Sequence, residues 1–247
     1  QLGPRGPTGP TGPTGPDGAT GAAGRTGPTG PYGLGGTDNP ARFISQPTGF
    51  NLQTMLVDLS KTQVATATNP IVIRLEPGTY FAGDPNTNPF NLPEWVTIEG
   101  SGEGVTTLKN GGTYATLADH ATLRNLTFDT GDFYLTGGGP DSTLDHVTVL
   151  ARSTTFRLGA CFAGSGKVLH SRLIASGQAS TALFLNFSGL MVVEDSLLQG
   201  EATSVRSLAG SVALVRTELV AQAAIGWTTD GGTKACIETT FGDAGLD

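Results

Sequence analysis

The stretch 121-ATLRNLTF-128 decides the fold, because variants of it recur along the chain at a nearly constant interval. Eight such blocks align: IVIRLEPG from Ile71, VTIEGSGE from Val96, ATLRNLTF from Ala121, STLDHVTV from Ser142, KVLHSRLI from Lys167, MVVEDSLL from Met191, VALVRTEL from Val212 and KACIETTF from Lys234. Their starts are separated by 25, 25, 21, 25, 24, 21 and 22 residues. A spacing held over so many copies is typical of a solenoid, in which each copy forms one coil.

An apolar residue fills the third position of every block, as stacked coils of a parallel β-helix require inside their tube. This predicted core stack consists of Ile73, Ile98, Leu123, Leu144, Leu169, Val193, Leu214 and Cys236. The eighth position adds a second inward column: Phe128, Val149, Ile174, Leu198, Leu219 and Phe241. We therefore predict an all-β domain over residues 51–247, a right-handed parallel β-helix of about eight coils. The alternative is an antiparallel β-sandwich, which favours spacings of about 8 to 12 residues and has no single repeating register.

One amphipathic segment precedes the repeat. Leu52, Met55, Leu56 and Leu59 recur at helical spacing, and Asn51 before them is a suitable N-cap. The pattern predicts a short helix over residues 51–61, placed to cap the first coil.

The first 36 residues follow a different period, with glycine at every third position until the pattern ends at Thr37. Only glycine fits at the axis where three polyproline-II-like chains meet, so residues 1–36 are predicted to form a collagen-like triple helix and the protein a homotrimer. Residues 37–50 are a junction, and a flexible linker is the alternative for the glycine-rich segment. The predicted axis residues are Gly3, Gly6, Gly9, Gly12, Gly15, Gly18, Gly21, Gly24, Gly27, Gly30, Gly33 and Gly36.

Two early segments, IVIRLEPGTYF at 71–81 and WVTIEGSGEGVTTL at 95–108, resemble the opening coils of the pectin-lyase-like superfamily of right-handed parallel β-helices. The resemblance covers about residues 44–247 and implies the fold, including a helix that caps the tube. It implies no single activity, because that superfamily holds lyases, hydrolases, esterases, tailspikes and proteins without catalysis. The Asn-Thr-Asp, Asp-Asp and Gly-His-Gly motifs of polygalacturonase-like enzymes do not occur in this sequence.

Four carboxylates come nearest to a glycosidase site. Asp129 and Asp132 lie at a predicted coil corner in FDTGD, and Asp141 and Asp145 lie on the next coil. Two carboxylates flanking a glycosidic bond suffice for hydrolysis, but aspartate and glycine also build turns. We interpret these residues as turn formers, and expect neither enzymatic activity nor a metal site nor a cofactor. The only histidines are His120, His146 and His170, and none follows a glycine. His146 and His170, one coil apart, are expected to face solvent or a neighbouring chain rather than to form a site.

Charge and cysteine content restrict the partners further. The net charge is −7 and no Lys/Arg cluster is present, so nucleic acid and anionic membranes are not expected as partners. No apolar run is long enough for membrane insertion. Cys161 and Cys236 lie four predicted coils apart, roughly 19 Å, whereas disulfides need Cα atoms within about 7 Å. We expect no bridge within one chain, and a buried thiol at Cys236.

Together these features predict a trimeric structural fibre or decoration protein of a phage virion, in which a collagen-like stalk presents a rigid β-helix head at the virion surface. Its expected partners are a virion or surface-anchoring protein on the N-terminal side of the stalk and, in addition, a host receptor or glycan. The alternatives are a collagen-like adhesin or filament protein of a bacterial cell or spore surface, and a tailspike-type polysaccharide depolymerase.

Overall fold

The computed structural model describes residues 3–6, 9, 42–46, 52, 55–57, 65–83, 90–110, 114–131, 134–152, 160–177, 180–185, 189–221, 225–229 and 233–243. The chain divides into two units, Gln1–Leu34 and Gly35–Asp247. The predicted triple helix lies almost wholly outside the described residues, and the homotrimer stays a prediction.

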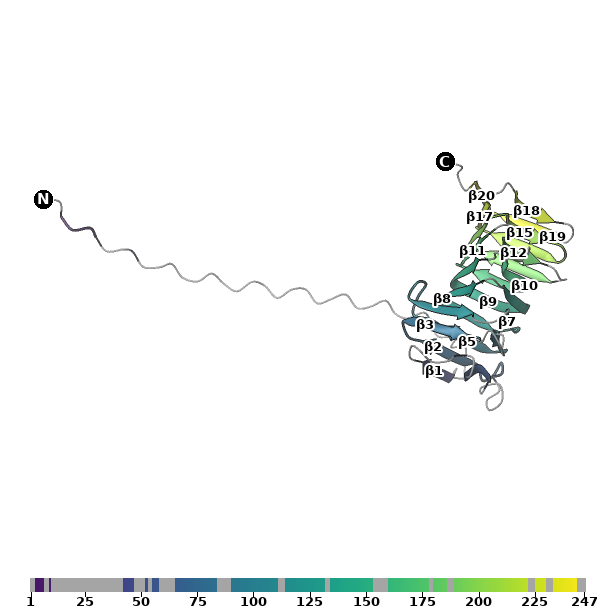
Figure 1. Ribbon diagram of the computed structural model, residues 1–247, viewed down its shortest axis with the longest axis horizontal. Helices are drawn as coiled ribbons and strands as arrows, with labels where there is room; N and C mark the ends of the chain where they lie inside the picture. Colours follow the sequence, from purple (N-terminus) through teal and green to yellow (C-terminus); the bar gives the residue numbers. More distant parts are fainter. Residues whose placement is uncertain are drawn as a thin grey trace. The chain divides into compact units, whose positions relative to one another are not determined.

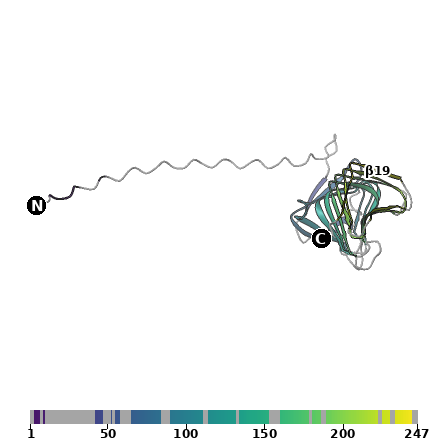
Figure 2. The same cartoon turned by 90° about the horizontal axis from the view of Figure 1, so that it is seen from above.

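The second unit is an all-β, right-handed parallel β-solenoid whose strands form three walls (Figure 1). Every pairing between its named strands is parallel, and each strand pairs with its equivalent one coil away, which is how a solenoid satisfies its backbone hydrogen bonds. Viewed along the stack, the coils superpose (Figure 2).

The first wall contains the repeating blocks. Its strands are β1 (Arg42–Gln46), β2 (Ile71–Leu75), β5 (Val96–Glu99), the start of β8 (Thr122–Gly131), the middle of β9 (Leu135–Arg152), the end of β10 (Ala160–Leu169), β13 (Leu190–Glu194), β16 (Ser211–Val215) and β19 (Thr233–Ile237).

The second wall follows a tight corner. Its strands are β3 (Gly78–Ala82), β6 (Thr106–Asn110), the end of β8, the end of β9, β11 (Arg172–Ser176), β14 (Leu197–Gly200), β17 (Glu218–Ala221) and β20 (Thr240–Asp243). The third wall closes each coil with β4 (Phe90–Leu92), β7 (Ala115–Leu117), the starts of β9 and β10, β12 (Thr181–Leu185), β15 (Thr203–Ser207) and β18 (Ile225–Thr229).

The number of coils is lower than predicted. Counting blocks gave about eight, whereas the solenoid has about six turns. Among the described residues the last coil is incomplete, because no third-wall strand follows β19 and β20.

Six of the eight residues of the predicted core stack line one buried column. Ile73, Ile98, Leu123, Leu144, Val193 and Leu214 are all fully buried. Their registers align them in one column, because side chains that alternate along each strand keep the same face from coil to coil.

Leu169 is a correction. Val168 is the residue that pairs with Leu144 and Val193, and it is fully buried, whereas Leu169 is only half-buried. The same one-residue shift places Leu173, not Ile174, in the second column. Gly166 is the cause of this one-residue error. It pairs with Met191, the first residue of the next block, so the block starts at Gly166. Because glycine has no apolar side chain, the hydrophobic pattern does not mark that start.

The last described strands differ from the prediction as well. Cys236 was expected to be a buried thiol and Phe241 an inward residue, yet Cys236 is exposed and Phe241 is 64% exposed. Both keep their registers, with Leu214 and Leu219, but no described coil stacks on their other side. The side chain of Cys161 lies outside the described part of the chain.

The predicted helix is partly described. Leu52 and residues 55–57 are helical, and Leu52, Met55 and Leu56 belong to the main hydrophobic cluster, as the apolar spacing predicted. Leu59 and the ends of the helix lie outside the described residues.

Candidate functional site

A column of left-handed residues turns the chain from the first wall to the second. We call this column the His170 corner, and it consists of Asn125, His146, His170, Asp195, Arg216 and Glu238. Their φ angles lie between 46° and 55°, a region that L-residues seldom adopt and that asparagine, aspartate and histidine tolerate best. In each coil the left-handed residue directly follows the last paired residue of the first wall. The left-handed residues of successive coils therefore line up along the outside of the solenoid.

A buried hydroxyl follows the left-handed residue in the C-terminal coils. Ser171, Ser196 and Thr217 donate to the carbonyl two residues earlier, at 2.6, 2.7 and 3.0 Å. Ser196 Oγ also accepts from the Ser171 amide at 3.0 Å. These bonds satisfy polar groups that the tight turn would otherwise bury unpaired, and they fix where the exposed side chains point.

Charges of opposite sign continue along this edge from coil to coil. Glu99 contacts both Arg74, at 3.1 Å, and Arg124, at 3.2 Å, on the coils before and after it. Further along, Arg216 contacts Asp195 through Nε at 2.6 Å and also reaches Glu194. The hydrogen bond from Arg216 lowers the pKa of Asp195, and the two carboxylates raise the pKa of Arg216.

His170 lies between carboxylates of the two flanking coils. Its Nδ1 is 3.0 Å from Asp145 Oδ1, and its Nε2 is 3.8 Å from Asp195 Oδ2. The side chain is 48% exposed, so the imidazole stays open to solvent and to a ligand.

An open cleft of about 570 Å³ lies beside the C-terminal part of the His170 corner. One side is formed by corner residues, the other by the outward column at the start of the second wall, and buried hydroxyls form the floor. Its lining is Glu103, His170, Ser171, Arg172, Asp195, Ser196, Leu197, Arg216, Glu218, Glu238 and Thr240. The cleft thus presents carboxylates, guanidinium groups and an imidazole over four coils, roughly 14 Å along the axis.

A second polar column lies where the third wall meets the first. The Trp95 ring stacks on His120, with centroids 4.0 Å apart and an angle of 13° between the planes. His120 lies near Asp119 and Asp141, at 3.9 and 3.7 Å. Lys167 binds Asp141 at 2.5 Å and lowers the pKa of that carboxyl.

The four candidate aspartates do not form one site among the described residues. Asp129 pairs with Arg152 on the second wall, at 3.5 Å, while Asp132 lies outside the described residues. Asp141 and Asp145 stand at opposite ends of one first-wall segment, four residues or about 13 Å apart along the strand. Glycosidase carboxylates lie closer, within about 10 Å, so these two are not placed as a catalytic pair.

None of the residues that line the cleft was predicted from the sequence as a site residue, and His170 was expected only to face solvent or a neighbouring chain. The signal is present in the aligned blocks as His170-Ser171, Asp195-Ser196, Arg216-Thr217 and Glu238-Thr239. A polar residue followed by serine or threonine marks this corner. It is hidden wherever an apolar residue replaces the hydroxyl, as after Asn125 and His146.

In the part of the chain that the structure describes, no helix is long and apolar enough to span a membrane.

No protein-family model matches the chain, and comparison with curated proteins gives no match. Two solved structures from Azotobacter vinelandii are similar to it. The A-module of mannuronan C-5 epimerase AlgE4 has 12% identity and a TM-score of 0.41, covering 76% of this chain and 71% of that one. The A-module of mannuronan C-5 epimerase AlgE6 has 11% identity and a TM-score of 0.32, covering 79% of this chain and 94% of that one.

These comparisons correct one expectation. The sequence was interpreted as that of a protein without enzymatic activity, whereas both similar structures are epimerase modules, so the exclusion of an enzymatic role does not stand. At these identities the likeness assigns no activity to this chain.

Proposed function

We propose that the β-solenoid is a carbohydrate-binding head that holds a glycan in the cleft beside the His170 corner. The observation that carries this proposal is the composition of the cleft, which is open and lined by carboxylates and guanidinium groups. Carboxylates accept hydrogen bonds from sugar hydroxyls, and guanidinium groups donate to hydroxyl and ring oxygens. An open groove that crosses several coils accepts a chain more readily than a small enclosed molecule.

The charges of the cleft select the class of glycan. Four carboxylates, Glu103, Asp195, Glu218 and Glu238, outnumber the guanidinium groups of Arg172 and Arg216. Arg216 is moreover held by Asp195 and Glu194, so its charge is already balanced. A polyanionic chain would meet net repulsion here, and we therefore propose a neutral, hydroxyl-rich polysaccharide as the ligand.

The collagen-like period extends the proposal from the single head to the assembled protein. Three chains joined by a triple helix would present three clefts at the end of one stalk, and multivalent attachment strengthens the binding of weak sites. We propose that the assembly is a trimeric fibre at the surface of a phage virion, anchored on the N-terminal side of the stalk and directed at a host-surface glycan. A bacterial adhesin of the same build is the alternative.

Glycan processing is a second candidate, favoured by the position of His170. Its imidazole lies between Asp145 and Asp195 at the edge of the cleft, and histidine is the side chain that most often serves as a general acid or base. A polysaccharide bound in the cleft would place hydroxyl groups beside this imidazole.

Titration calorimetry of the full chain with neutral and polyuronate polysaccharides tests the proposal. Binding of a neutral polysaccharide and at least tenfold weaker binding of the polyuronate are expected. Failure of every neutral polysaccharide to bind would contradict it. Chain length and new reducing or unsaturated ends, measured in the same mixtures, separate binding from processing, and light scattering tests the trimer.

A further inference from the structure

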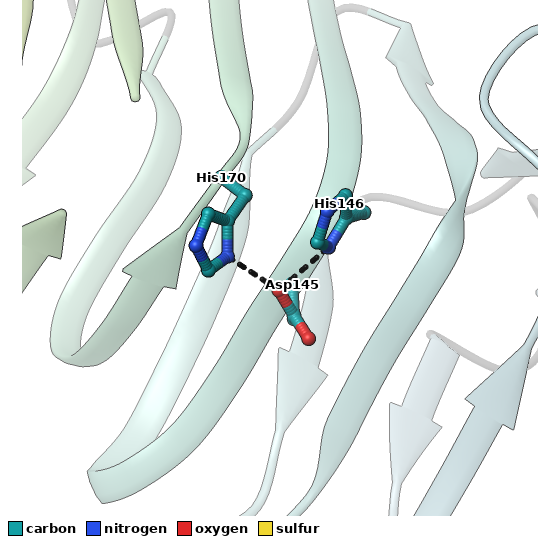
Figure 3. A group of neighbouring side chains, drawn as sticks. All are labelled: Asp145, His146 and His170. Carbon is teal, nitrogen blue, oxygen red and sulfur yellow. Dashed lines mark hydrogen bonds and ion pairs between the residues drawn. The ribbon is translucent and has the colours of Figure 1, made fainter. Parts of the chain in front are cut away.

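Asp145, His146 and His170 form a cluster on neighbouring coils of the His170 corner (Figure 3). Asp145 Oδ1 lies 2.9 Å from His146 Nδ1 and 3.0 Å from His170 Nδ1. Figure 3 shows both rings with these nitrogens directed at one carboxylate oxygen. Three side chains with ligand chemistry therefore converge on one point outside the solenoid.

The coil register creates this convergence. Asp145 pairs with Leu169, so the residues after them, His146 and His170, lie above one another in the left-handed column. Their rings stack at 4.8 Å with 23° between the planes. The cluster is thus built on two hydrogen-bonded strands whose spacing is fixed by the backbone, rather than on loose surface side chains.

The donor set is that of a transition-metal site. One ligand atom from each residue lies within 4.8 Å of the other two. Imidazole nitrogens with a carboxylate oxygen suit Zn²⁺, Co²⁺, Ni²⁺ or Cu²⁺, while Ca²⁺ and Mg²⁺ prefer oxygen ligands alone. Zinc binds such nitrogens and oxygens at about 2.0 to 2.2 Å, which small side-chain rotations from the observed contacts would reach.

The surroundings of His170 match those of a metal-bound histidine. When Nδ1 binds an ion, the other ring nitrogen commonly faces an outer carboxylate that orients the ring. His170 Nε2 faces Asp195 at 3.8 Å, and Arg216 holds that carboxylate in place. His146 and His170 are 55% and 48% exposed, so an ion can enter from solvent and keep positions for water.

The cluster at Asp119, His120 and Asp141 provides a comparison on the same protein. It also brings three ligand atoms together, but it has one histidine, and Lys167 already neutralises Asp141 at 2.5 Å. An ammonium group at that distance competes directly with a cation.

We propose that Asp145, His146 and His170 bind one divalent transition-metal ion, with Zn²⁺ as the reference ion, through both imidazoles and the carboxylate. The proposal does not depend on glycan binding, because the three ligand atoms already lie together without a glycan and only His170 among the three residues lines the cleft. The site adds to the solenoid an ion-binding function that ties two neighbouring coils together.

The experiment uses the full chain, stripped with a chelator and titrated with Zn²⁺ by calorimetry and with Co²⁺ by visible absorption near pH 7.5. We expect about one ion per chain, and a cobalt spectrum that Zn²⁺ removes and Ca²⁺ in excess leaves unchanged. His146→Ala and His170→Ala should each weaken binding at least tenfold, and Asp145→Asn should also weaken it. His120→Ala is the matched control and should change the affinity less than twofold.

Unchanged binding in the His146→Ala/His170→Ala double variant would overturn the proposal, as would no binding of either ion at millimolar concentration. Circular dichroism of each variant shows whether it folds, and His146→Gln, which keeps a polar exposed side chain, provides a second test. Glu218→Ala, which alters the cleft alone, should leave the metal affinity unchanged. About tenfold weaker glycan binding in that variant, with metal binding intact, separates the two proposals.

Discussion

Arg216 holds Asp195 of the preceding coil through two parallel hydrogen bonds, Nε to Oδ1 at 2.6 Å and Nη2 to Oδ2 at 2.8 Å. This two-point contact joins adjacent coils at the edge of the cleft. It is a geometry that a lysine, with a single charged nitrogen, does not reproduce.

The Arg216–Asp195 pair makes the stability of the fold depend on pH in the acid range. Hydrogen bonding to Arg216 lowers the pKa of folded Asp195 below its ordinary value of 3.8. The resulting stabilisation is fully present above about pH 3.8 and is lost as the pH falls through the lower pKa of the folded state. Arg216→Gln should therefore reduce the melting temperature at pH 6 and flatten its dependence on pH between about 2 and 4. Arg74→Gln is a control of the same chemistry outside the cleft, and an equal flattening there would contradict the assignment.

The corrected register of the fifth block can be tested by a matched pair of core substitutions. Leu173 is fully buried, whereas Ile174 is only half-buried. Leu173→Ala should lower the free energy of unfolding by about 2 to 5 kcal/mol, and Ile174→Ala by clearly less, because only the first leaves a cavity. Chemical denaturation measures both, and the reverse order would restore the original alignment.

Gly137 is required by a close backbone approach in the third wall. A Cβ at this position would lie 2.0 Å from the Ser165 carbonyl oxygen and 2.8 Å from the Phe162 ring. Gly137→Ala should cost about 1 to 3 kcal/mol, since neither the backbone nor the packed ring can move away freely. Thr136→Ala on the same strand is the control for a surface change, and denaturation of both variants compares them.

The cleft should lose affinity for a neutral polysaccharide when charged side chains on its second-wall side are shortened. Arg172 and Glu218 belong to one outward column, two coils apart, and both are exposed. Arg172→Ala and Glu218→Ala should each weaken binding about tenfold, which corresponds to a charged hydrogen bond. Arg152→Ala, an exposed arginine outside the cleft, should change the affinity less than twofold. Equal effects of all three would indicate a nonspecific charge effect.

Cys236 should react with a thiol reagent in the native protein. Its exposure at the last described first-wall strand predicts modification within minutes under native conditions, without denaturant. Cys236→Ser is the control that removes this fast phase. A Cys236 thiol that reacts only after denaturation would show that other atoms cover it, as the sequence had suggested.

Much of the fold was predictable because a solenoid repeats one local pattern. The third-position residues from Ile73 to Leu214 lie in one buried column, with Leu169 as the exception. That exception has a local cause. Gly166 carries no side chain to mark the block boundary, and a shift of one residue reverses which side chain faces inward.

The candidate site was less predictable, because its residues are adjacent only across coils. His146 and His170 are 24 positions apart in the chain, and each looked like an isolated solvent-facing histidine. The strand register stacks them over Asp145 and places His170 next to Asp195.

By itself, the sequence determined the parallel β-solenoid, since a block with the same apolar positions recurs every 21 to 25 residues over eight copies, as stacked coils require. The tertiary structure alone decided which polar side chains share a corner and which carboxylates stay apart. Those distances are set by the coil spacing, the corner geometry and the strand register, which a shift of one residue would change. Hydropathy predicts which residues point inward, but it does not distinguish among the polar residues that remain outside.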